Sequence, residues 1–509
     1  MNEHLIGVDI GTQGTKGALF DAAGCCLATA FVKSRLHQPS PGVVEEDPEY
    51  QVATVCRVIR ECVRTARISP GSVAAIGIDG QMAGVIGIGA NGRNVTTYDS
   101  WLDTRCAPQI EAMKRRAGRE IVRRTGCAPS FNHGPKILWW MQERPAVFRR
   151  IRSFVQPGGY AVMRLCGLRA DEAFIDVTYL HFSGFADNRR GRWDAGLCRA
   201  FGVDEAKLPH IVASQAIVGG LTAAMARACG LAPDTPVIAG CGDTAASFLA
   251  AGATRAGIGA DVAGTASVFA ATTAEFRADT DRMILGCGRS ATPGLWHPYA
   301  YINGGGMNLE WFASKIAGPG AGKGSARFRM LERQAAAEPR ADDPFFIPHL
   351  GGRVAPSCPA LRGAWAGLMW THSAGHLYRA MLEGVALEYA VYRKALRAIF
   401  AEQALRELRV VGGGGESALW NQIKSDVLGT PVTKLSRPEG APMGAALLAG
   451  FGAGLFPDLH AAACQWIRRG ATFRPNRRLA SHYARRLADY ERLLESVHKW
   501  SRPSRPEGK

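Results

Sequence analysis

A turn rich in glycine and threonine directly follows the first apolar run of the chain, residues 5–10. Glycines let backbone N–H groups approach an anion, while threonine hydroxyls and a lysine add donors and positive charge. A related turn, Gly264-Thr265, follows a second apolar run at residues 257–262. The pair predicts two phosphate-binding hairpins that face one nucleotide. The residues of the first turn are Gly11, Thr12, Gly14, Thr15 and Lys16.

Asp9 lies just before the first turn and is a candidate ligand for hydrated Mg²⁺, which prefers oxygen ligands. The turn lacks the G-x-x-x-x-G-K-[ST] spacing of a Walker A loop. A glycine and threonine turn between apolar strands is also common in a simple hairpin. The nucleotide interpretation therefore depends on the other motifs of the chain.

Length and composition indicate a globular enzyme of more than one domain. A chain of 509 residues exceeds the size of one hydrophobic core, and 47% hydrophobic with 21% charged residues is ordinary for a globular protein. Charge-free apolar stretches stay below the ~20 residues that span a bilayer. We therefore expect a cytoplasmic protein without a membrane partner.

Charge and cysteine content exclude two further classes. The formal net charge is +17, but the 61 basic residues are spread along the chain and form no basic, aromatic-rich module, so we expect no nucleic-acid partner. The 13 cysteines are odd in number and scattered, which favours reduced thiols over a disulfide framework.

The order of predicted elements favours an α/β fold. Three strands at 5–10, 17–20 and 26–32 precede a helix that opens at Asp47-Pro48, and a buried strand follows at 73–78. This βββαβ order describes a ribonuclease-H-like unit rather than a Rossmann unit.

The second half shows the same kind of pattern, with strands around Gly264-Thr265, a long helix near 373–400 and a strand-helix-helix series after residue 408. A cluster of turn residues at 230–236 marks the predicted boundary. We therefore expect two ribonuclease-H-like domains of the actin and hexokinase superfamily, residues 1–234 and 235–480, flanking an ATP and sugar cleft. A C-terminal helix and a disordered tail would occupy residues 481–509, with the helix packing on the first domain or on a second subunit.

Two further motifs carry chemistry. Asp243 ends an apolar strand and begins an alanine-rich helix, so it could cap the helix or accept a proton from a substrate hydroxyl that attacks the γ-phosphate of ATP. Four glycines at 412–415, followed by Glu416, separate a strand from a helix. Bare backbone of this kind favours contact with an adenine or a ribose.

Taken with these motifs, the chain resembles the FGGY carbohydrate kinase family, and within it the xylulokinase branch. The family's C-terminal signature is met by Gly363, Trp365, Gly367-Leu368, His376-Leu377 and residues 380–383. The resemblance implies that Asp243 is the catalytic base and that Asp9 lies near the metal and the phosphates. It further implies ATP contacts from Gly11, Thr12, Thr15, Lys16, Gly264, Thr265, Gly413, Gly414, Gly415, Glu416 and Asn421.

The resemblance also implies sugar contacts from Gln81, Met82, Ala83, Asp103 and Asp243, with Arg105 bracing Asp103. The chain departs from the xylulokinase pattern in this region. Ala83 replaces a histidine, Leu102 an asparagine and Gly352 a glutamate, while His133 stands where a small residue is usual. Such changes alter discrimination between hydroxylated substrates.

The implied activity is ATP-dependent phosphorylation of a sugar hydroxyl with Mg²⁺, favouring D-xylulose as substrate and D-xylulose 5-phosphate as product. The alternative is another ketose or polyol, such as L-xylulose, ribulose, a sugar alcohol or a linear signalling sugar. A nucleotide-binding regulator of the actin-like superfamily would share the glycine turns, but the position of Asp243 and the segment near Trp101 argue against it. A homodimer is an open expectation.

Overall fold

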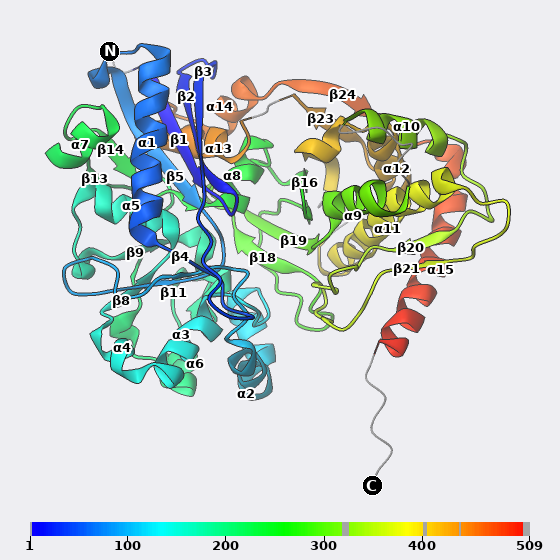
Figure 1. Ribbon diagram of the computed structural model, residues 1–509, viewed down its shortest axis with the longest axis horizontal. Helices are drawn as coiled ribbons and strands as arrows, with labels where there is room; N and C mark the ends of the chain where they lie inside the picture. Colours follow the sequence, from blue (N-terminus) through cyan, green and yellow to red (C-terminus); the bar gives the residue numbers. More distant parts are fainter. Residues whose placement is uncertain (1–2, 318–324, 401–404, 437–438, 502–509) are drawn as a thin grey trace, which may run out of the picture.

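Two lobes, each built around a mixed β-sheet, lie side by side in the computed structural model of the protein (Figure 1). The structure describes residues 3–317, 325–400, 405–436 and 439–501. The predicted disordered tail therefore lies almost wholly outside the described residues.

The sheet of the first lobe has parallel strands at its centre, where β5 pairs with β1 and β14, and antiparallel pairs at both sides, β1 with β2 and β3 beyond it, and β13 with β14. Its order is β13 (Ile217–Gly220), β14 (Pro236–Ile238), β5 (Val73–Gly80), β1 (His4–Ile10), β2 (Gly14–Asp21) and β3 (Cys26–Lys33), with β15 (Cys241–Gly242) also paired to β5.

The sheet of the second lobe repeats this plan. Its order is β18 (Gly286–Arg289), β19 (Trp296–Ile302), β17 (Ser267–Ala270), β16 (Gly257–Ala263), β22 (Leu405–Val411), β23 (Val432–Leu435) and β24 (Arg469–Phe473). In the first sheet β1 forms a hairpin with β2 and pairs in parallel with β5, and in the second β16 forms a hairpin with β17 and pairs in parallel with β22. The prediction of one α/β architecture used twice is confirmed.

Shorter strand pairs complete the described β-structure: β4 (Glu45–Glu46) with β7 (Tyr98–Asp99), β6 (Ile86–Ile88) with β8 (Ser153–Val155), β9 (Phe174–Asp176) with β12 (His210–Val212), β10 (Ala186–Asp187) with β11 (Arg192–Trp193), and β20 (Phe345–Ile347) with β21 (Ala364–Ala366).

Helices cover both faces of the sheets. They are α1 (Pro48–Ala66), α2 (Ala107–Thr125), α3 (His133–Glu143), α4 (Pro145–Arg150), α5 (Pro157–Cys166), α6 (Ala195–Phe201), α7 (Ala223–Cys229), α8 (Asp243–Ala250), α9 (Gly305–Trp311), α10 (Ser325–Ala335), α11 (Ala374–Ile399), α12 (Ala418–Leu428), α13 (Ala441–Gly452), α14 (Leu459–Trp466) and α15 (Ala480–Trp500). Short 3₁₀ turns include η3 (Val177–Phe182) and η8 (Gly413–Glu416).

Helix α1 begins where the sequence predicts. The side chain of Asp47 accepts a hydrogen bond from the backbone N–H of Glu49 at 3.0 Å, and Pro48 occupies the first turn. The apolar stripe of the helix is buried against β2 and β3. Burial of this stripe, rather than helix propensity alone, holds α1 on the sheet.

Helix α13 covers the opposite face of the first sheet although it comes late in the chain. A Cβ atom added at Gly7 of β1 would lie 1.8 Å from the carbonyl oxygen of Pro442, and one at Gly77 of β5 would lie 2.2 Å from that of Ala445. Gly444 in turn faces the backbone of Ala246 in α8, where an added Cβ would lie 2.0 Å from the carbonyl oxygen. Helix and sheet therefore meet backbone to backbone, which only glycine permits.

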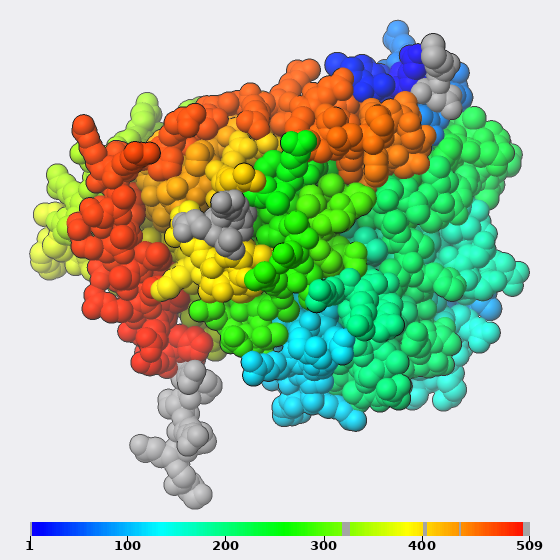
Figure 2. Space-filling view, turned by 180° about the vertical axis from the view of Figure 1, so that it is seen from behind, coloured from blue at the N-terminus to red at the C-terminus, as the bar shows by residue number. Residues whose placement is uncertain are grey.

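The chain crosses between the lobes more than once. The strand at 236–238 belongs to the first sheet because β14 pairs with β5, although the sequence analysis begins the second domain at residue 235. After α13 returns to the first sheet, α14 and β24 lead back to the second. Seen from behind, the orange segment that contains them runs along one edge of the molecule (Figure 2).

Helix α15 packs on α11 and α12 of the second lobe. The hydroxyl of Tyr490 donates to Glu388 at 2.7 Å, and Arg486 forms an ion pair with Glu383 at 3.0 Å. Of the two alternatives that the sequence leaves open, packing on the first domain does not occur, because the buried polar groups of the helix are matched to carboxylates on α11, and packing on a second subunit stays a prediction.

Candidate functional site

Three aspartates lie at one edge of the first sheet. The parallel strands β1 and β5 place Asp9 beside Asp79 in register, and β15 places Cys241 beside Asp79, so that Asp243 follows at the same edge. Ligands of open α/β sheets bind at the carboxyl ends of the strands. This edge is therefore the candidate site of the first lobe.

Burial raises the pKa of all three carboxyl groups. Desolvation raises the pKa of Asp9 to about 6 even though Asp79 and the positive charge of Lys16 oppose the shift. Burial, reinforced by the negative charge of Asp9, raises the pKa of Asp243 to about 7. Asp79 is fully buried, and its pKa lies well above the ordinary value because burial and the charge of Asp9 both act on it.

Asp243 is the first residue of α8, while Gly242 takes the cap position, and no cap hydrogen bond from a side chain is formed. The Asp243 carboxylate accepts a hydrogen bond from the hydroxyl of Thr244 at 3.0 Å and remains partly exposed. The alternative that Asp243 acts as the N-cap is thus not realised, and the carboxylate is left facing the edge of the sheet.

The residues of the first turn differ in their exposure and in their hydrogen-bond partners. Gly11 and Thr12 are partly exposed, and the Thr12 hydroxyl accepts from the indole N–H of Trp101 at 2.8 Å. Thr15 is 3% exposed and its hydroxyl lies 2.6 Å from that of Thr54 in α1. Lys16 donates to the carbonyl of Glu439, just before α13, at 3.0 Å.

The turns of the second lobe lie side by side. Strands β16 and β22 are parallel, so Gly264-Thr265 and the glycines at 412–415 follow at the same edge. Gly412 has a φ of 91°, which favours glycine, and a Cβ at Gly414 would lie 2.8 Å from Ala263. Gly413 is exposed and a Cβ there would meet nothing within 4 Å, which leaves its backbone open to a ligand.

Asn421 and Glu416 hold the glycine turn in place. Asn421 is fully buried and donates from its amide to the carbonyl of Gly415 at 2.8 Å. Glu416 is exposed and pairs with Lys434 at 2.6 Å. Asn421 therefore positions the turn from its buried side, whereas Gly412 and Gly413 are the exposed part of the turn.

The predicted sugar segment adjoins Asp243. Met82 and Ala83 are partly exposed, and a Cβ at Gly242 would lie 1.9 Å from the sulfur of Met82. His133 of α3 is 1% exposed and its Nε2 donates to the carbonyl of Met82 at 2.8 Å. Burial lowers the pKa of His133 to about 4, so the ring is neutral and its Nδ1 is an acceptor that has no partner in the described residues.

Gln81 and Asp103 are less accessible. Gln81 is 1% exposed and donates to Glu46 at 2.9 Å. Asp103 is 2% exposed and accepts from the backbone N–H of Val44 at 2.9 Å and from the Nε of Arg105 at 3.0 Å. Arg105 thus braces Asp103 as expected, and a sugar contact to Asp103 stays a prediction.

Sequence reasoning missed Asp79 and a second glycine segment. The run Ile76-Gly77-Ile78-Asp79 repeats the run Ile6-Gly7-Val8-Asp9, a similarity that could have identified Asp79. Gly304 to Gly306 open α9, and the N–H of Gly306 donates to the carbonyl of Gly264 at 3.0 Å. Three consecutive glycines after β19 were the available signal for this contact.

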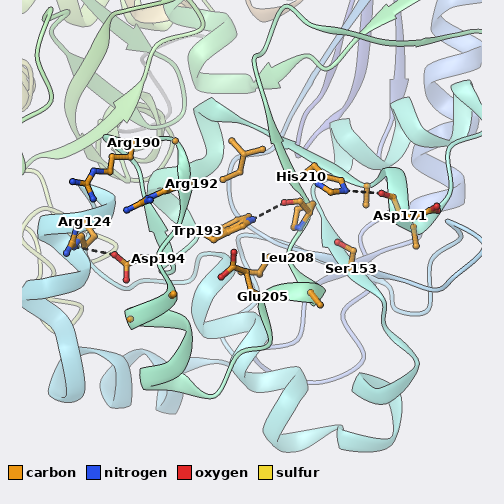
Figure 3. Close-up of a pocket in the computed structure, with 18 residues that line it drawn as sticks. Arg124, Ser153, Asp171, Arg190, Arg192, Trp193, Asp194, Glu205, Leu208 and His210 are labelled. Carbon is orange, nitrogen blue, oxygen red and sulfur yellow. Dashed lines mark hydrogen bonds and ion pairs between the residues drawn. The ribbon is translucent and has the colours of Figure 1, made fainter.

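A pocket of about 1080 Å³ lies elsewhere in the first lobe, between β11, α6 and the loop before β12 (Figure 3). None of the predicted ATP or sugar residues lines it. Its polar groups largely bond to one another: Arg124 pairs with Asp194 at 3.4 Å, and His210 bonds to the carbonyl of Asp171 at 3.0 Å. The volume of this pocket therefore does not identify the functional site. The candidate site stays at the edges of the two sheets.

The donor set at the first edge fits a magnesium ion. One carboxylate oxygen of Asp9 is buried without a hydrogen-bond partner in the described residues, and carboxylate oxygen is a preferred Mg²⁺ ligand. No group of three His, Cys, Asp or Glu residues with metal-binding geometry occurs within the described residues. This suits Mg²⁺, which usually takes one or two carboxylates together with water and substrate phosphates.

Comparison with known proteins identifies one family in both halves of the chain. The model of the N-terminal domain of the FGGY family of carbohydrate kinases matches residues 4–250, and that of its C-terminal domain matches residues 259–453. A xylulose kinase from Bacillus subtilis (strain 168) is 26% identical over 490 residues, with 94% of each chain covered. A glycerol kinase from Citrifermentans bemidjiense is 29% identical over 480 residues, covering 91% of this chain and 93% of the relative.

Among solved structures, a xylulose kinase from Rhodospirillum rubrum superposes with a TM-score of 0.90 at 29% identity, covering 98% of this chain and 99% of that one. Within the described residues, no helix has the length and apolar character that a membrane span requires.

Proposed function

Because the chain belongs to the FGGY family of carbohydrate kinases and is a sugar kinase, we propose that it transfers the γ-phosphoryl group of ATP to a hydroxyl of D-xylulose, giving D-xylulose 5-phosphate. The observation that carries the proposal is the position of Asp243, a partly exposed residue that follows Gly242, against which Met82 packs. The Asp243 pKa of about 7 suits a general base near neutral pH.

In the proposed mechanism, Asp243 accepts the proton of the sugar hydroxyl as that oxygen attacks the γ-phosphorus. The Gly11-Thr12 and Gly264-Thr265 turns stabilise charge on the transferred group through the backbone N–H groups of Thr12 and Thr265, since those of Gly11 and Gly264 close the turns themselves. Gly413 and its neighbours hold the adenosine. Apart from the proton transfer to Asp243, these roles are electrostatic or positional, as is usual for phosphoryl transfer.

Asp9 would hold Mg²⁺, with Lys16 opposite it on β2 at the paired register position. When bound, the ion neutralises charge on the ATP phosphates. In the protein itself, the positive charge of Lys16 partly opposes the rise that burial causes in the pKa of Asp9, and the negative charge of Asp9 adds to the rise that burial causes in the pKa of Asp243.

The sugar identity rests on weaker support than the reaction. Relatives named xylulose kinase favour D-xylulose, whereas a relative named glycerol kinase matches over a similar length at 29% identity. Ala83 and His133 both lie at Met82 and both depart from the xylulokinase pattern. They favour the second candidate, a different ketose or a polyol, because a lost polar contact changes which hydroxyl pattern is accepted.

The first experiment measures ATP-dependent phosphorylation across ketopentoses, aldoses, polyols and glycerol as kcat/KM, with a sugar-free ATPase control. The highest value for D-xylulose supports the proposed substrate. A higher value for another compound assigns the second candidate. Absence of sugar-stimulated turnover in folded protein would overturn the kinase proposal.

The role of Asp243 is tested by Asp243→Asn. We expect kcat to fall by about two orders of magnitude or more while ATP binding stays nearly unchanged, because the base is lost and the nucleotide turns are intact. The matched control is Asp458→Asn, at the start of α14, where asparagine preserves the cap. Near wild-type turnover of Asp243→Asn would remove the assignment.

A further inference from the structure

A fully buried ion pair lies in the core of the second lobe, between a strand and a helix that adjoin the proposed nucleotide turns. Asp261 on β16 and Lys424 on α12 are each 0% exposed, and the Nζ of Lys424 donates to one carboxylate oxygen of Asp261 at 2.5 Å. The hydroxyl of Tyr389 on α11, which is also fully buried, donates to the other oxygen at 2.7 Å. Asp261 therefore connects β16 to both α11 and α12, which lie together in the second lobe (Figure 1).

Stability alone does not explain why charged groups occupy this core. The cost of removing a carboxylate and an ammonium group from water can exceed their mutual attraction, and apolar side chains of similar volume often stabilise a core equally well. Tyr389, Trp420 and Val410, the register partner of Asp261, belong to the apolar core around the pair. Unlike apolar contacts, hydrogen bonds depend on direction as well as on distance. The bonds of Asp261 therefore fix how α11 and α12 lie against β16.

Trp420 connects the ion pair to the glycine turn at 412–415. The Nζ of Lys424 lies 4.0 Å from the centroid of the Trp420 ring, and the indole N–H donates to the carbonyl of Leu382 on α11 at 3.0 Å. A carbon of the six-membered ring meets the turn, because a Cβ added at Gly414 would lie 2.8 Å from it. The position of Trp420 therefore determines how far the backbone at Gly414 can approach α12.

The strand that carries Asp261 leads directly to the other turn. Asp261 lies three residues before Gly264, and Ala263 is the last residue of β16. A Cβ at Gly412 would lie 2.8 Å from the carbonyl oxygen of Ala263, and one at Gly414 would lie 2.8 Å from the Cβ of Ala263. The end of β16 and the glycine turn therefore pack directly on each other, so a shift of α12 against β16 would move one turn relative to the other.

Glu388 on α11 has the same arrangement of donors in a different place. One of its carboxylate oxygens accepts from the guanidinium of Arg353 at 2.8 Å and the other from the hydroxyl of Tyr490 at 2.7 Å. Glu388 is 0% exposed, as Asp261 is. Its donors belong to α15 and to the segment between β20 and β21 instead of to the elements that adjoin the turns. Glu388 and Tyr490 therefore provide a matched reference for Asp261 and Tyr389.

We propose that Asp261, Tyr389 and Lys424 are positioning residues for the nucleotide, which hold the glycine turn at 412–415 and the Gly264-Thr265 turn at the separation that one ATP molecule requires. This inference rests on the proposed roles of the two turns in ATP binding. The three side chains are fully buried and act through Trp420 and through the end of β16. Their loss weakens ATP binding and leaves sugar binding intact, because the proposed sugar contacts lie in the first lobe.

The decisive experiment compares Tyr389→Phe with Tyr490→Phe in the full-length protein. Each variant removes one hydroxyl donor from a buried carboxylate that keeps its cation, so we expect similar decreases in melting temperature. Calorimetric titration with MgATP in the absence of sugar gives the Kd, and steady-state kinetics give KM for ATP and for the sugar. Tyr389→Phe should raise the Kd and KM for ATP by about threefold or more with KM for the sugar unchanged, whereas Tyr490→Phe should leave all three constants unchanged.

Equal nucleotide constants in Tyr389→Phe and the wild type, or equal changes in both tyrosine variants, would overturn the inference. A wild type that binds no MgATP would overturn the proposed function and this inference together, whereas MgATP binding of equal strength in the wild type and Tyr389→Phe contradicts the inference alone.

A triple variant separates positioning from stability. Asp261→Leu, Tyr389→Phe and Lys424→Met together replace the group by apolar side chains of similar volume, which a core tolerates well. We expect a melting temperature close to that of the wild type and a Kd for MgATP raised at least as far as in Tyr389→Phe. A wild-type Kd in this folded variant would show that the group contributes only to stability. Tyr389→Phe, which keeps the ion pair, decides the question if the triple variant does not fold.

Discussion

The pKa of Asp243 predicts how the proposed reaction depends on pH. A general base must be ionised, and burial together with the charge of Asp9 raises the pKa of this carboxyl to about 7. We expect kcat/KM for the sugar to fall about tenfold per pH unit below this value and to level off above it. A profile that is flat between pH 5.5 and 8.5 would contradict the assignment of Asp243 as base.

The same shift has the opposite effect on stability. A raised carboxyl pKa means that the native state keeps a proton that the unfolded chain has released, so its stability falls as pH rises from about 4 to about 7. Asparagine does not titrate. The melting temperature of Asp243→Asn relative to the wild type should therefore increase from pH 5 to pH 8, which separates the shifted pKa from the catalytic role.

His133 provides a prediction about sugar discrimination. Its Nε2 holds the carbonyl of Met82 at 2.8 Å, and its ring packs near Tyr179, whose hydroxyl donates to the carbonyl of Gly80 at 2.9 Å. His133→Phe keeps the ring but removes the donor, leaving a carbonyl unpaired at a cost of about 1–3 kcal/mol. We expect KM for the sugar to rise and the ranking of sugars to change, with KM for ATP unchanged.

Rescue by His133→Gln, which restores an N–H donor, distinguishes positioning of the Met82 segment from general destabilisation. If both variants lower kcat, KM for sugar and KM for ATP alike, the effect is structural and His133 does not set specificity.

The residues of the site differ in how far sequence could predict them. Asp9 and Asp243 were recognisable because each follows an apolar run, and the structure places them at one sheet edge, Asp9 on β1 and Asp243 just after β15, with β5 between these two strands. Asp79 also follows an apolar run, but only the register of β5 against β1 shows that it lies beside Asp9. The hydroxyl of Thr15 bonds to Thr54 on a helix 39 residues later, a pairing that no local pattern contains.

At the scale of elements, the approach of α13 to the first sheet depends on glycine. A Cβ at Gly444 would lie 2.0 Å from the carbonyl oxygen of Ala246, which belongs to backbone and cannot move aside as a flexible side chain would. We expect Gly444→Ala to lower the free energy of unfolding by about 2–4 kcal/mol or to prevent folding. Denaturant titration followed by circular dichroism measures the loss.

The control is Gly71→Ala, where an added Cβ meets nothing within 4 Å. It should be neutral or slightly stabilising, because alanine loses less backbone entropy on folding. Equal stability of both variants would mean that α13 sits further from α8 than the structure indicates.

Most strands and helices were predictable because the spacing of their apolar residues matches either the helical or the strand period, as in α1 and the first three strands. The surface on which α13 packs was not predictable. Residues 441–450 are all buried, so the sequence shows no polar face that would indicate which side meets a neighbour. The glycines at positions 7 and 77, on strands far away in the chain, determine where that helix docks.

At the scale of the whole molecule, the path of the chain makes the first lobe incomplete without the second half of the sequence. Helix α13 buries Met443, Leu447 and Leu448 in a core shared with Leu5 and Phe20 of the first sheet. A fragment of residues 1–250 would expose that face of β1 and β5 to water. Exposed apolar faces of this kind cause association between chains.

We therefore expect the 1–250 fragment, expressed alone, to be insoluble or to lack a cooperative thermal transition. The core of the first lobe needs the residues of α13 but no peptide bond between the two fragments. Co-expression with residues 251–509 should therefore restore a soluble complex that elutes at the size of the intact chain. A fragment that melts cooperatively on its own would show that the first sheet is stable without α13. In that case α13 would join the two lobes without being required for the stability of the first.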